Sequence, residues 1–460
     1  MPLRRAARLL LRRLTPAQLV LVSFAAAILL GTGLLALPGM AAPGTPAPRV
    51  IDLLFVATSA VCVTGLTPLD LGSRFSPLGQ LVILLLVQAG GLGIMTYSTL
   101  VVLLLRGRLT VRGRLTLEDT LGRTPVELDL RRLIRTVFTS SFVIEGAGAV
   151  LLTARFVWDM PAGEAVWFGL FHAVSAFNNA GLSLFPDSLG RYVGDPLVNA
   201  VVPLLIILGG LGFLVLDELW AWRERRQRVK PLSLHTKLVL STSALLIGLG
   251  MVGFYLLERA NTLAELPATS ALLATWFHAV VPRTAGFNTL DVSRFANPTL
   301  FLTIVLMFIG ASPGSTGGGI KTTTAAILWG IVRSQFRGEE RVHLFRRALP
   351  RGVVGRAVSI AAGAALVVAA VTLALQVTET LGAPTTAGRA LFLELLFETV
   401  SAFGTVGLST GVTPRLTDAG KLLIVLTMYV GRVGPLTLTL GLARRPHGRF
   451  QYCEEPVVVG

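Results

Sequence analysis

Ser401-Ala402-Phe403-Gly404-Thr405-Val406-Gly407-Leu408 is the last of four related stretches in this chain. The other three are Ser59-Ala60-Val61-Cys62-Val63-Thr64-Gly65-Leu66, Ser175-Ala176-Phe177-Asn178-Asn179-Ala180-Gly181-Leu182 and Val281-Pro282-Arg283-Thr284-Ala285-Gly286-Phe287. Their shared glycines, at positions 65, 181, 286 and 407, are 116, 105 and 121 residues apart. A fourfold internal repeat explains this spacing most simply, because each copy then forms one supersecondary unit.

Each glycine follows an apolar run that is too short to cross a membrane, such as 165–177 or 391–403. Longer apolar stretches of about 20 residues, the length of a transmembrane helix, lie on either side, for example 19–37 and 237–257. Irregular backbone at membrane depth is tolerated only where protein buries it or where it lines a water-filled path. The pattern therefore predicts an all-α integral membrane protein with eight transmembrane helices, arranged as four helix/pore-loop/helix repeats around one pseudo-fourfold pore.

Composition supports a membrane protein, since only 14% of the 460 residues are charged and 53% are hydrophobic. The net charge of +16 is not gathered into a nucleic-acid-binding domain. Instead, 28 of the 41 Lys and Arg residues fall in the five segments 1–17, 106–132, 223–237, 333–356 and 444–449. Eight others, including Lys421, fall in the expected outer segments. The positive-inside rule then places both termini in the cytoplasm, in a multi-pass protein of the cytoplasmic membrane surrounded by lipid, with no nucleic-acid partner.

The expected boundaries follow from the spans and the repeats. They are a cytoplasmic N-terminus at 1–17, pore repeat 1 at 18–132, repeat 2 at 133–235, repeat 3 at 236–356 with a broken last helix, repeat 4 at 357–443, and a cytoplasmic tail at 444–460.

The glycine turns are the expected ion-binding site. Glycine adopts backbone angles that turn carbonyl oxygens toward an axis, where they can replace the hydration shell of an ion. Thr405-Val406-Gly407 matches the start of the K⁺-channel filter sequence. The candidate filter residues are Val63, Thr64, Gly65, Asn179, Ala180, Gly181, Thr284, Ala285, Gly286, Thr405, Val406 and Gly407. A single such glycine would be an ordinary turn, but four in register with half-helices favour a filter.

A glycine-rich segment at 310–319 interrupts the sixth span and cannot remain a regular helix. It differs from a phosphate-binding loop because Ile320 stands between Gly319 and Lys321 and no strand precedes it. A movable constriction below the filter is one interpretation, and a static kink is the other. The candidate gate residues are Gly310, Gly314, Ser315, Thr316, Gly317, Gly318, Gly319, Lys321 and Arg432.

Arg432 lies well inside the last span, where a charge is costly and usually faces a polar interior. It either opposes a cation in the pore or forms an ion pair with a carboxylate such as Glu398 or Asp217. Lys321 either stabilises the closed loop or lies near the cytoplasmic end of its helix. These alternatives remain open from the sequence.

Other polar residues have less specific patterns. We expect His172 and His278 to lie at the starts of the second and third half-helices, and we find no metal cluster. Carboxylates near the turns either concentrate cations at the mouth or are solvated loop charges; they are Asp70, Asp187, Asp291, Glu394 and Glu398. Cys62 and Cys453 fall on opposite sides of the expected membrane, so we predict no disulfide between them.

Three motifs together resemble the Trk/Ktr/HKT superfamily of K⁺ transport proteins, and its Ktr branch in particular. They are Pro282-Arg283-Thr284-Ala285-Gly286-Phe287-Asn288-Thr289, Gly314-Ser315-Thr316-Gly317-Gly318-Gly319-Ile320-Lys321 and Gly431-Arg432-Val433-Gly434-Pro435-Leu436. The resemblance covers nearly the whole chain. It implies a homodimer with one pore per subunit, K⁺ at the filter carbonyls, a gating loop, an arginine in the pathway, and a cytosolic ring of nucleotide-binding KtrA-like subunits. Gly65 is implied to favour K⁺, because plant relatives with serine there conduct Na⁺.

The sequence thus predicts potassium uptake through a K⁺-selective pore, with no catalytic residues, no enzyme activity and no cofactor apart from K⁺ as the transported ion. The alternative is a Na⁺- or H⁺-coupled K⁺ symporter of the same fold. Na⁺ is either coupled to K⁺ uptake or regulates it.

Overall fold

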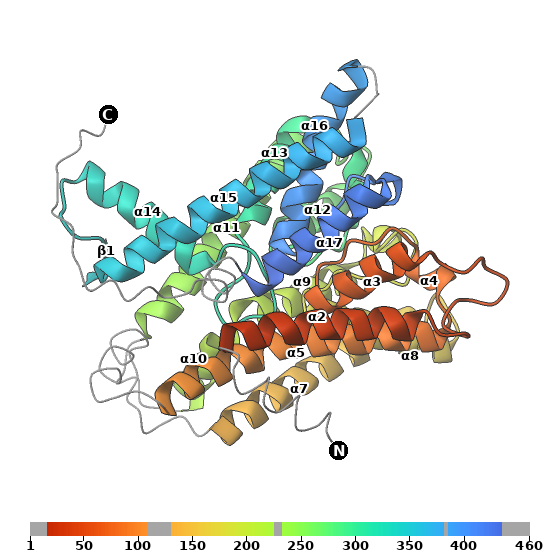
Figure 1. Ribbon diagram of the computed structural model, residues 1–460, viewed down its shortest axis with the longest axis horizontal. Coiled ribbons are helices and arrows are strands. Elements are labelled where there is room, and N and C mark those ends of the chain that lie inside the picture. The colour runs from red at the N-terminus through yellow and green to blue at the C-terminus, as the bar shows by residue number, and fades with distance from the viewer. Residues whose placement is uncertain (1–15, 108–129, 225–231, 381–384, 435–460) are drawn as a thin grey trace.

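The computed structural model describes residues 16–107, 130–224, 232–380 and 385–434, which fold almost entirely as helices (Figure 1). The first repeat comprises α2 (Pro16–Leu35), α3 (Val50–Cys62), α4 (Leu71–Arg74) and α5 (Pro77–Gly107). The second comprises α7 (Leu130–Phe156), α8 (Ala162–Phe177), the 3₁₀ helix η2 (Gly190–Tyr192), α9 (Pro196–Leu211) and α10 (Phe213–Glu224).

The third repeat comprises α11 (Leu234–Glu258), α12 (Ala268–Val280), η3 (Val292–Arg294), α13 (Asn297–Phe308) and α14 (Thr322–Phe336). The fourth comprises α15 (Arg351–Thr380), α16 (Thr385–Gly404), η4 (Thr413–Arg415) and α17 (Asp418–Val433). A small antiparallel hairpin, β1 (His343–Leu344) and β2 (Arg347–Ala348), separates the last two repeats. Each repeat therefore contains a first helix, a helix that ends at the glycine turn, a short helical turn and a last helix.

Local sequence determines where these helices begin and end. Pro161 and Pro267 directly precede α8 and α12. An N–H group at a helix start has no acceptor within the helix, so a proline there removes no helical hydrogen bond. The Thr417 side chain caps α17 by accepting a hydrogen bond from the Gly420 amide. Gly212 takes a φ of 87° and separates α9 from α10, which bend by 99° relative to each other. The last helix of the second repeat is thus broken, as is that of the third.

The repeats pack against one another in cyclic order. Helix α5 of the first repeat contacts α7 and α8 of the second, and α9 of the second contacts α12 of the third. Helix α13 of the third repeat contacts α16 of the fourth, and α17 of the fourth returns to contact α3 of the first. Figure 1 shows α2 and α5 running alongside each other at one side of the bundle, and α15 along the opposite side.

In the part of the chain that the structure describes, four helices are long and apolar enough to cross a membrane: Gln18–Leu35, Val137–Phe156, Leu234–Glu258 and Arg351–Thr380. A fifth span results if α9 and α10 are taken as one bent helix, and shorter apolar helices include Val50–Cys62 and Asn297–Phe308. Leu29 and Leu366 are 67% and 71% exposed on the outside of the bundle, as expected for side chains that face lipid. The count of eight spans remains a prediction.

Several predicted segments lie outside the described residues. They include most of the basic segments at the N-terminus, at 106–132 and at the C-terminus, together with Cys453 and Leu436.

Candidate functional site

The four glycine turns meet at one place in the molecule. A β-carbon built on each glycine would collide with the carbonyl oxygen just before the glycine of the next repeat. The distance between the built β-carbon and that carbonyl oxygen is 2.5 Å for Gly65 and Ala180, 2.4 Å for Gly181 and Ala285, 2.7 Å for Gly286 and Val406, and 2.2 Å for Gly407 and Thr64. Because the series closes on itself, the turns form a ring of four, which we call the glycine ring. Only glycine fits at these four positions without displacing a neighbouring carbonyl.

The backbone of the ring has the same conformation in every repeat. The glycines have φ values of 100°, 66°, 67° and 94° in chain order. The residue two positions earlier is also left-handed, although it is not glycine; these residues are Val63 (54°), Asn179 (60°), Thr284 (71°) and Thr405 (50°). Left-handed non-glycine residues are uncommon and cluster at functional sites. The fourfold recurrence of two unusual conformations indicates that the four turns share one structural role.

Hydrogen bonds from the preceding helix fix each turn. The Thr64 and Val406 amides donate to the carbonyl oxygens of Ser59 and Ser401, at 2.8 Å in both repeats. The Oγ atoms of these serines accept the amide hydrogens of Gly65 and Gly407 at 3.0 Å. In the second repeat, the Ala180 amide donates to the Ser175 carbonyl at 2.7 Å. The helices therefore position the turns rigidly from behind, and all four helices direct their carboxyl ends toward the ring.

The glycine-rich segment at 310–319 lies against the ring. A β-carbon on Gly317 would be 2.1 Å from Thr284 Oγ1, and one on Gly318 would be 2.3 Å from Thr405 Oγ1. The Thr316 hydroxyl donates to Asn179 Oδ1 at 3.0 Å. As predicted, the apolar run is interrupted here: α13 ends at Phe308, and α14 begins at Thr322. Its small residues allow the segment to lie directly against Thr284 and Thr405.

The same segment rests on the broken helix of the second repeat. The Ser312 and Thr316 amides donate to the carbonyl oxygens of Gly210 and Gly209, at 3.1 and 3.3 Å. In return, the Phe213 amide donates to the Gly314 carbonyl at 3.2 Å. Backbone groups freed by the break between α9 and α10 are therefore satisfied by the loop.

Two cations hold the loop. Arg432 is 2% exposed and donates from Nη1 to the Thr316 carbonyl and from Nη2 to the Gly90 carbonyl, the latter at 2.8 Å. Lys321 donates from Nζ to the Gly317 carbonyl at 2.7 Å. The alternative in which Arg432 forms an ion pair with Glu398 is wrong. Glu398 instead accepts hydrogen bonds from the hydroxyls of Ser409 and Thr413. Lys321 does contact the loop, as one of its two interpretations required.

The sequence of this chain matches one protein family over a range that includes the glycine ring and the segment at 310–319. The family described as "TrkH: Cation transport protein" matches residues 18–451. The chain belongs to the TrkH family of cation transport proteins. Two relatives bear the name Ktr system potassium uptake protein B. The one from Bacillus subtilis is 39% identical over 97% of each chain, and that from Vibrio alginolyticus is 38% identical over 96% of this chain and 94% of its own.

A third relative is potassium/sodium uptake protein NtpJ from Enterococcus hirae, which is 38% identical over 98% of each chain. Among solved structures, the potassium transporter TrkH from Vibrio parahaemolyticus superposes with a TM-score of 0.71, at 18% identity, over 93% of this chain and 84% of its own. The fold of this chain is therefore a TrkH fold, in a membrane transport protein, and the resemblance found from the three motifs is confirmed.

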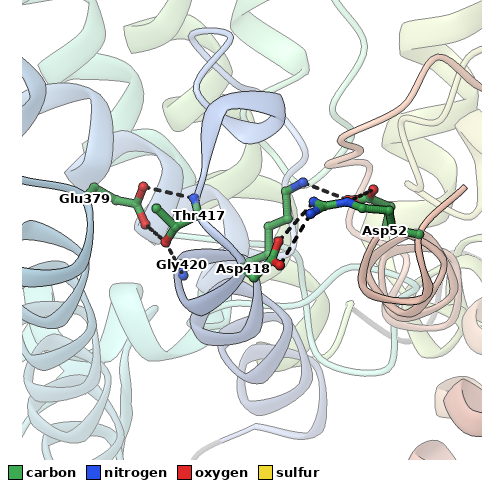
Figure 2. Close-up of polar contacts among 7 residues, drawn as sticks. Asp52, Glu379, Thr417, Asp418 and Gly420 are labelled. Atoms are coloured by element: carbon green, nitrogen blue, oxygen red, sulfur yellow. Dashed lines mark hydrogen bonds and ion pairs between the residues drawn. The ribbon is translucent and has the colours of Figure 1, made fainter.

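A polar junction closes this TrkH-family fold between its first and last repeats (Figure 2). Lys421 on α17 is 4% exposed and donates to Asp52 of α3 at 2.7 Å. Nearer the surface, Arg49 contacts both Asp52 and Asp418, at 3.2 and 3.0 Å. On the other side of α17, Figure 2 shows Glu379 of α15 accepting hydrogen bonds from Thr417. Lys421, which the sequence pattern assigned to an outer segment, is buried near the start of α17, and its membrane side stays a prediction.

The structure places the other predicted polar residues as follows. Asp70 and Asp291 cap the short helical turns after their glycines, and Asp187 pairs with Arg191 at 2.9 Å. Glu394 lies 3.7 Å from Arg415, and Glu398 is completely buried. Most of these carboxylates are therefore engaged with neighbouring groups, and Glu398 is not a solvated loop charge.

The expected position of the two histidines was wrong. His172 lies in the second half of α8 and His278 in the last turn of α12, because both helices begin about ten residues earlier, after their prolines. Each ring is buried among aromatic side chains: His172 stacks on Phe185 with centroids 5.0 Å apart, and His278 stacks on Phe254 at 5.1 Å. They are packing residues of the helices that precede the second and third glycine turns.

Proposed function

We propose that this protein takes up K⁺ across the cytoplasmic membrane through a pore formed at the glycine ring. The observation that carries this proposal is the cyclic contact of each glycine with the carbonyl of the next repeat. It leaves a ring of backbone oxygens from four repeats as the lining of one narrow path. Carbonyl oxygens in such a ring replace the hydration shell of K⁺.

The electrostatics of the ring favour a monovalent cation. Helices α3, α8, α12 and α16 direct their carboxyl ends, the negative ends of their dipoles, toward it. The hydroxyls of Thr64 and Thr405 are buried, and within the described residues they have no hydrogen-bond partner. Their oxygens are therefore free to serve as additional ligands. In this proposal the twelve filter residues, Val63–Gly65, Asn179–Gly181, Thr284–Gly286 and Thr405–Gly407, surround dehydrated K⁺.

We assign the gate to the segment at 310–319 with Lys321 and Arg432. The segment lies directly below Thr284 and Thr405, so it blocks the path that leaves the ring. Arg432 holds the segment by the Thr316 carbonyl and adds a positive charge that repels cations. Movement of the loop away from the ring opens the path.

The eight-span arrangement with both termini in the cytoplasm completes the proposal. Relatives named as parts of a Ktr system support assembly with further subunits. We therefore propose a homodimer with a cytosolic nucleotide-binding ring docked on the basic inner segments. The relative named for both potassium and sodium uptake favours a second candidate, in which Na⁺ also passes or drives uptake.

Flux into proteoliposomes tests the proposal. Purified protein is reconstituted with K⁺, Na⁺ or choline outside, and an ionophore sets the membrane voltage. K⁺ influx that follows and reverses with its electrochemical gradient supports a selective pore. K⁺ uptake against that gradient, only when a Na⁺ or proton gradient is supplied, supports the coupled alternative. Equal flux of K⁺, Na⁺ and choline contradicts both.

A further inference from the structure

A buried carboxylate lies behind the second glycine turn. Glu145, in the middle of α7, is only 2% exposed. Both of its oxygens accept hydrogen bonds from Gln88 Nε2 of α5 at 3.0 Å, and Oε1 also accepts one from Asn178 Nδ2 at 2.9 Å. Within the described residues, no ion pair involves Glu145. An intramembrane carboxylate is costly, so its presence indicates a specific role.

The three side chains form a closed triad between the first two repeats. Asn178 is completely buried, and its Nδ2 also donates to Gln88 Oε1 at 2.8 Å. Gly91 allows α5 to approach closely, because a β-carbon there would lie 1.9 Å from Asn178 Oδ1. Every member of the triad therefore contacts the other two.

Asn178 and Asn179 have different hydrogen-bond partners. Asn178 contacts Glu145, whereas Asn179, the left-handed residue of the second turn, extends to the third repeat and to the gate loop. Asn179 Nδ2 donates to the Arg283 carbonyl at 3.3 Å, and its Oδ1 accepts from Thr316 at 3.0 Å. A shift of Asn178 would therefore displace both the filter turn and the support of the loop.

The corresponding positions of the other repeats have different anchors. Three residues before each ring glycine lie Cys62, Asn178, Arg283 and Gly404. Among the residues that the structure describes, the Arg283 guanidinium makes two long hydrogen bonds, of 3.4 Å to Ser243 Oγ and to the Gly310 carbonyl. Gly404 has no side chain with which to form one. At this position, Asn178 therefore makes shorter side-chain hydrogen bonds than Arg283 does.

We propose that Glu145 is a positioning residue for ion selection: through Asn178 it holds the second filter turn and, with Asn179, the gate loop beneath it. This inference rests on the proposed function. The carboxylate accepts the three amide N–H contacts that converge on it, which an amide in its place could not do. Its loss lets Asn178 rotate, and the carbonyls around Gly181 lose their fixed spacing.

The test compares Glu145→Gln with the exchanged pair Gln88→Glu/Glu145→Gln in reconstituted protein. In the single variant, the new amide group faces the amide donors of Gln88 and Asn178, so the K⁺/Na⁺ influx ratio should fall at least fivefold. In the exchanged pair, the carboxylate now at position 88 accepts from Asn178 and from the amide now at position 145, so the ratio should return to within twofold of wild type. A merely structural role would lower the yield of folded protein in Glu145→Gln and leave the ratio unchanged.

An unchanged ratio in well-folded Glu145→Gln overturns the inference, as does failure of the exchanged pair to restore it. If Glu145→Gln does not fold, Gln88→Ala provides the second test, since it removes one donor to Glu145 and one acceptor from Asn178. Its ratio should fall to an intermediate value, and a wild-type ratio there also overturns the inference. Absence of K⁺ influx in the wild type would instead contradict the proposed function itself.

Discussion

At the residue scale, the glycine ring combines strain with close contact. Val63, Asn179, Thr284 and Thr405 each adopt a left-handed conformation that costs roughly 1–3 kcal/mol in a non-glycine residue. Backbone carbonyls of the preceding helices hold these turns in place, serine hydroxyls add to this in the first and fourth repeats, and the next repeat presses against each glycine. The strain persists because these surrounding contacts fix the backbone of each turn.

Gly407→Ser should reduce the K⁺/Na⁺ influx ratio by about tenfold or more. Its β-carbon would be 2.2 Å from the Thr64 carbonyl oxygen, so that carbonyl must shift and the spacing of the ring changes. Flux of each cation into proteoliposomes measures the ratio.

The matched control is Gly411→Ser. Gly411 has a φ of 87°, close to the 94° of Gly407, but a β-carbon there meets nothing within 4 Å. Backbone strain is similar in both variants, so only crowding of the ring distinguishes them. Equal ratios in the two variants would contradict the assignment of Gly407 to the filter.

Arg432→Ala should raise K⁺ influx several-fold. The change removes the hydrogen bonds to the carbonyls of Thr316 and Gly90 and the positive charge near the path. Arg432→Lys keeps the charge and should give an intermediate flux. Arg415→Ala, at an exposed outer position, is the control and should match the wild type. Flux no higher than wild type in folded Arg432→Ala counts against its role in the gate.

At the element scale, the break between α13 and α14 is supported by the break between α9 and α10. The loop at 310–319 exchanges three backbone hydrogen bonds with the region around Gly212, donating two and accepting one, so two irregular segments satisfy each other's polar groups. This pairing of two broken helices places the loop directly against the ring.

Deletion of 315–318 should raise K⁺ influx, because the shortened loop no longer reaches Thr284 and Thr405. The effect should be at least as large as that of Arg432→Ala, since the obstruction itself is removed. Deletion of four residues from the β1–β2 hairpin, at 344–347, is the control for the effect of shortening. Equal flux in the two deletions would favour a static kink at 310–319.

The elements also show what the sequence could predict. The four turns, their preceding helices and the interrupted helix follow from a repeat and from glycine chemistry, so they were predictable. The burial of Lys421 and the partners of Glu145 depend on how repeats pack together, and no local pattern contains that information. The sequence signal for Glu145 was a charged residue within an apolar run. That signal did not predict its hydrogen-bond partners, Gln88 and Asn178. The histidines were misplaced because proline positions set the helix starts.

At the scale of the whole molecule, closure of the ring depends on contact between the first and last repeats. Lys421 and Asp52 form a buried ion pair at that junction, and Arg49 and Asp418 continue it toward the surface (Figure 2). Removal of one member of a buried pair leaves an uncompensated charge. The junction should therefore matter to the stability of the entire bundle.

Lys421→Met should destabilise the protein by about 3 kcal/mol, because Asp52 remains buried with only the exposed Arg49 as a partner. The double variant Asp52→Asn/Lys421→Met should recover at least half of that loss. Thermal unfolding in detergent measures both. Additive losses in the double variant would show that the pair does not couple the two repeats.

The central claim is that the glycine ring binds dehydrated K⁺. Anomalous scattering from crystals grown with Tl⁺ or Rb⁺ in place of K⁺ tests it directly. We predict strong anomalous density on the axis between the carbonyl oxygens of the four turns. Anomalous density elsewhere in the molecule, with none inside the ring, would contradict the claim.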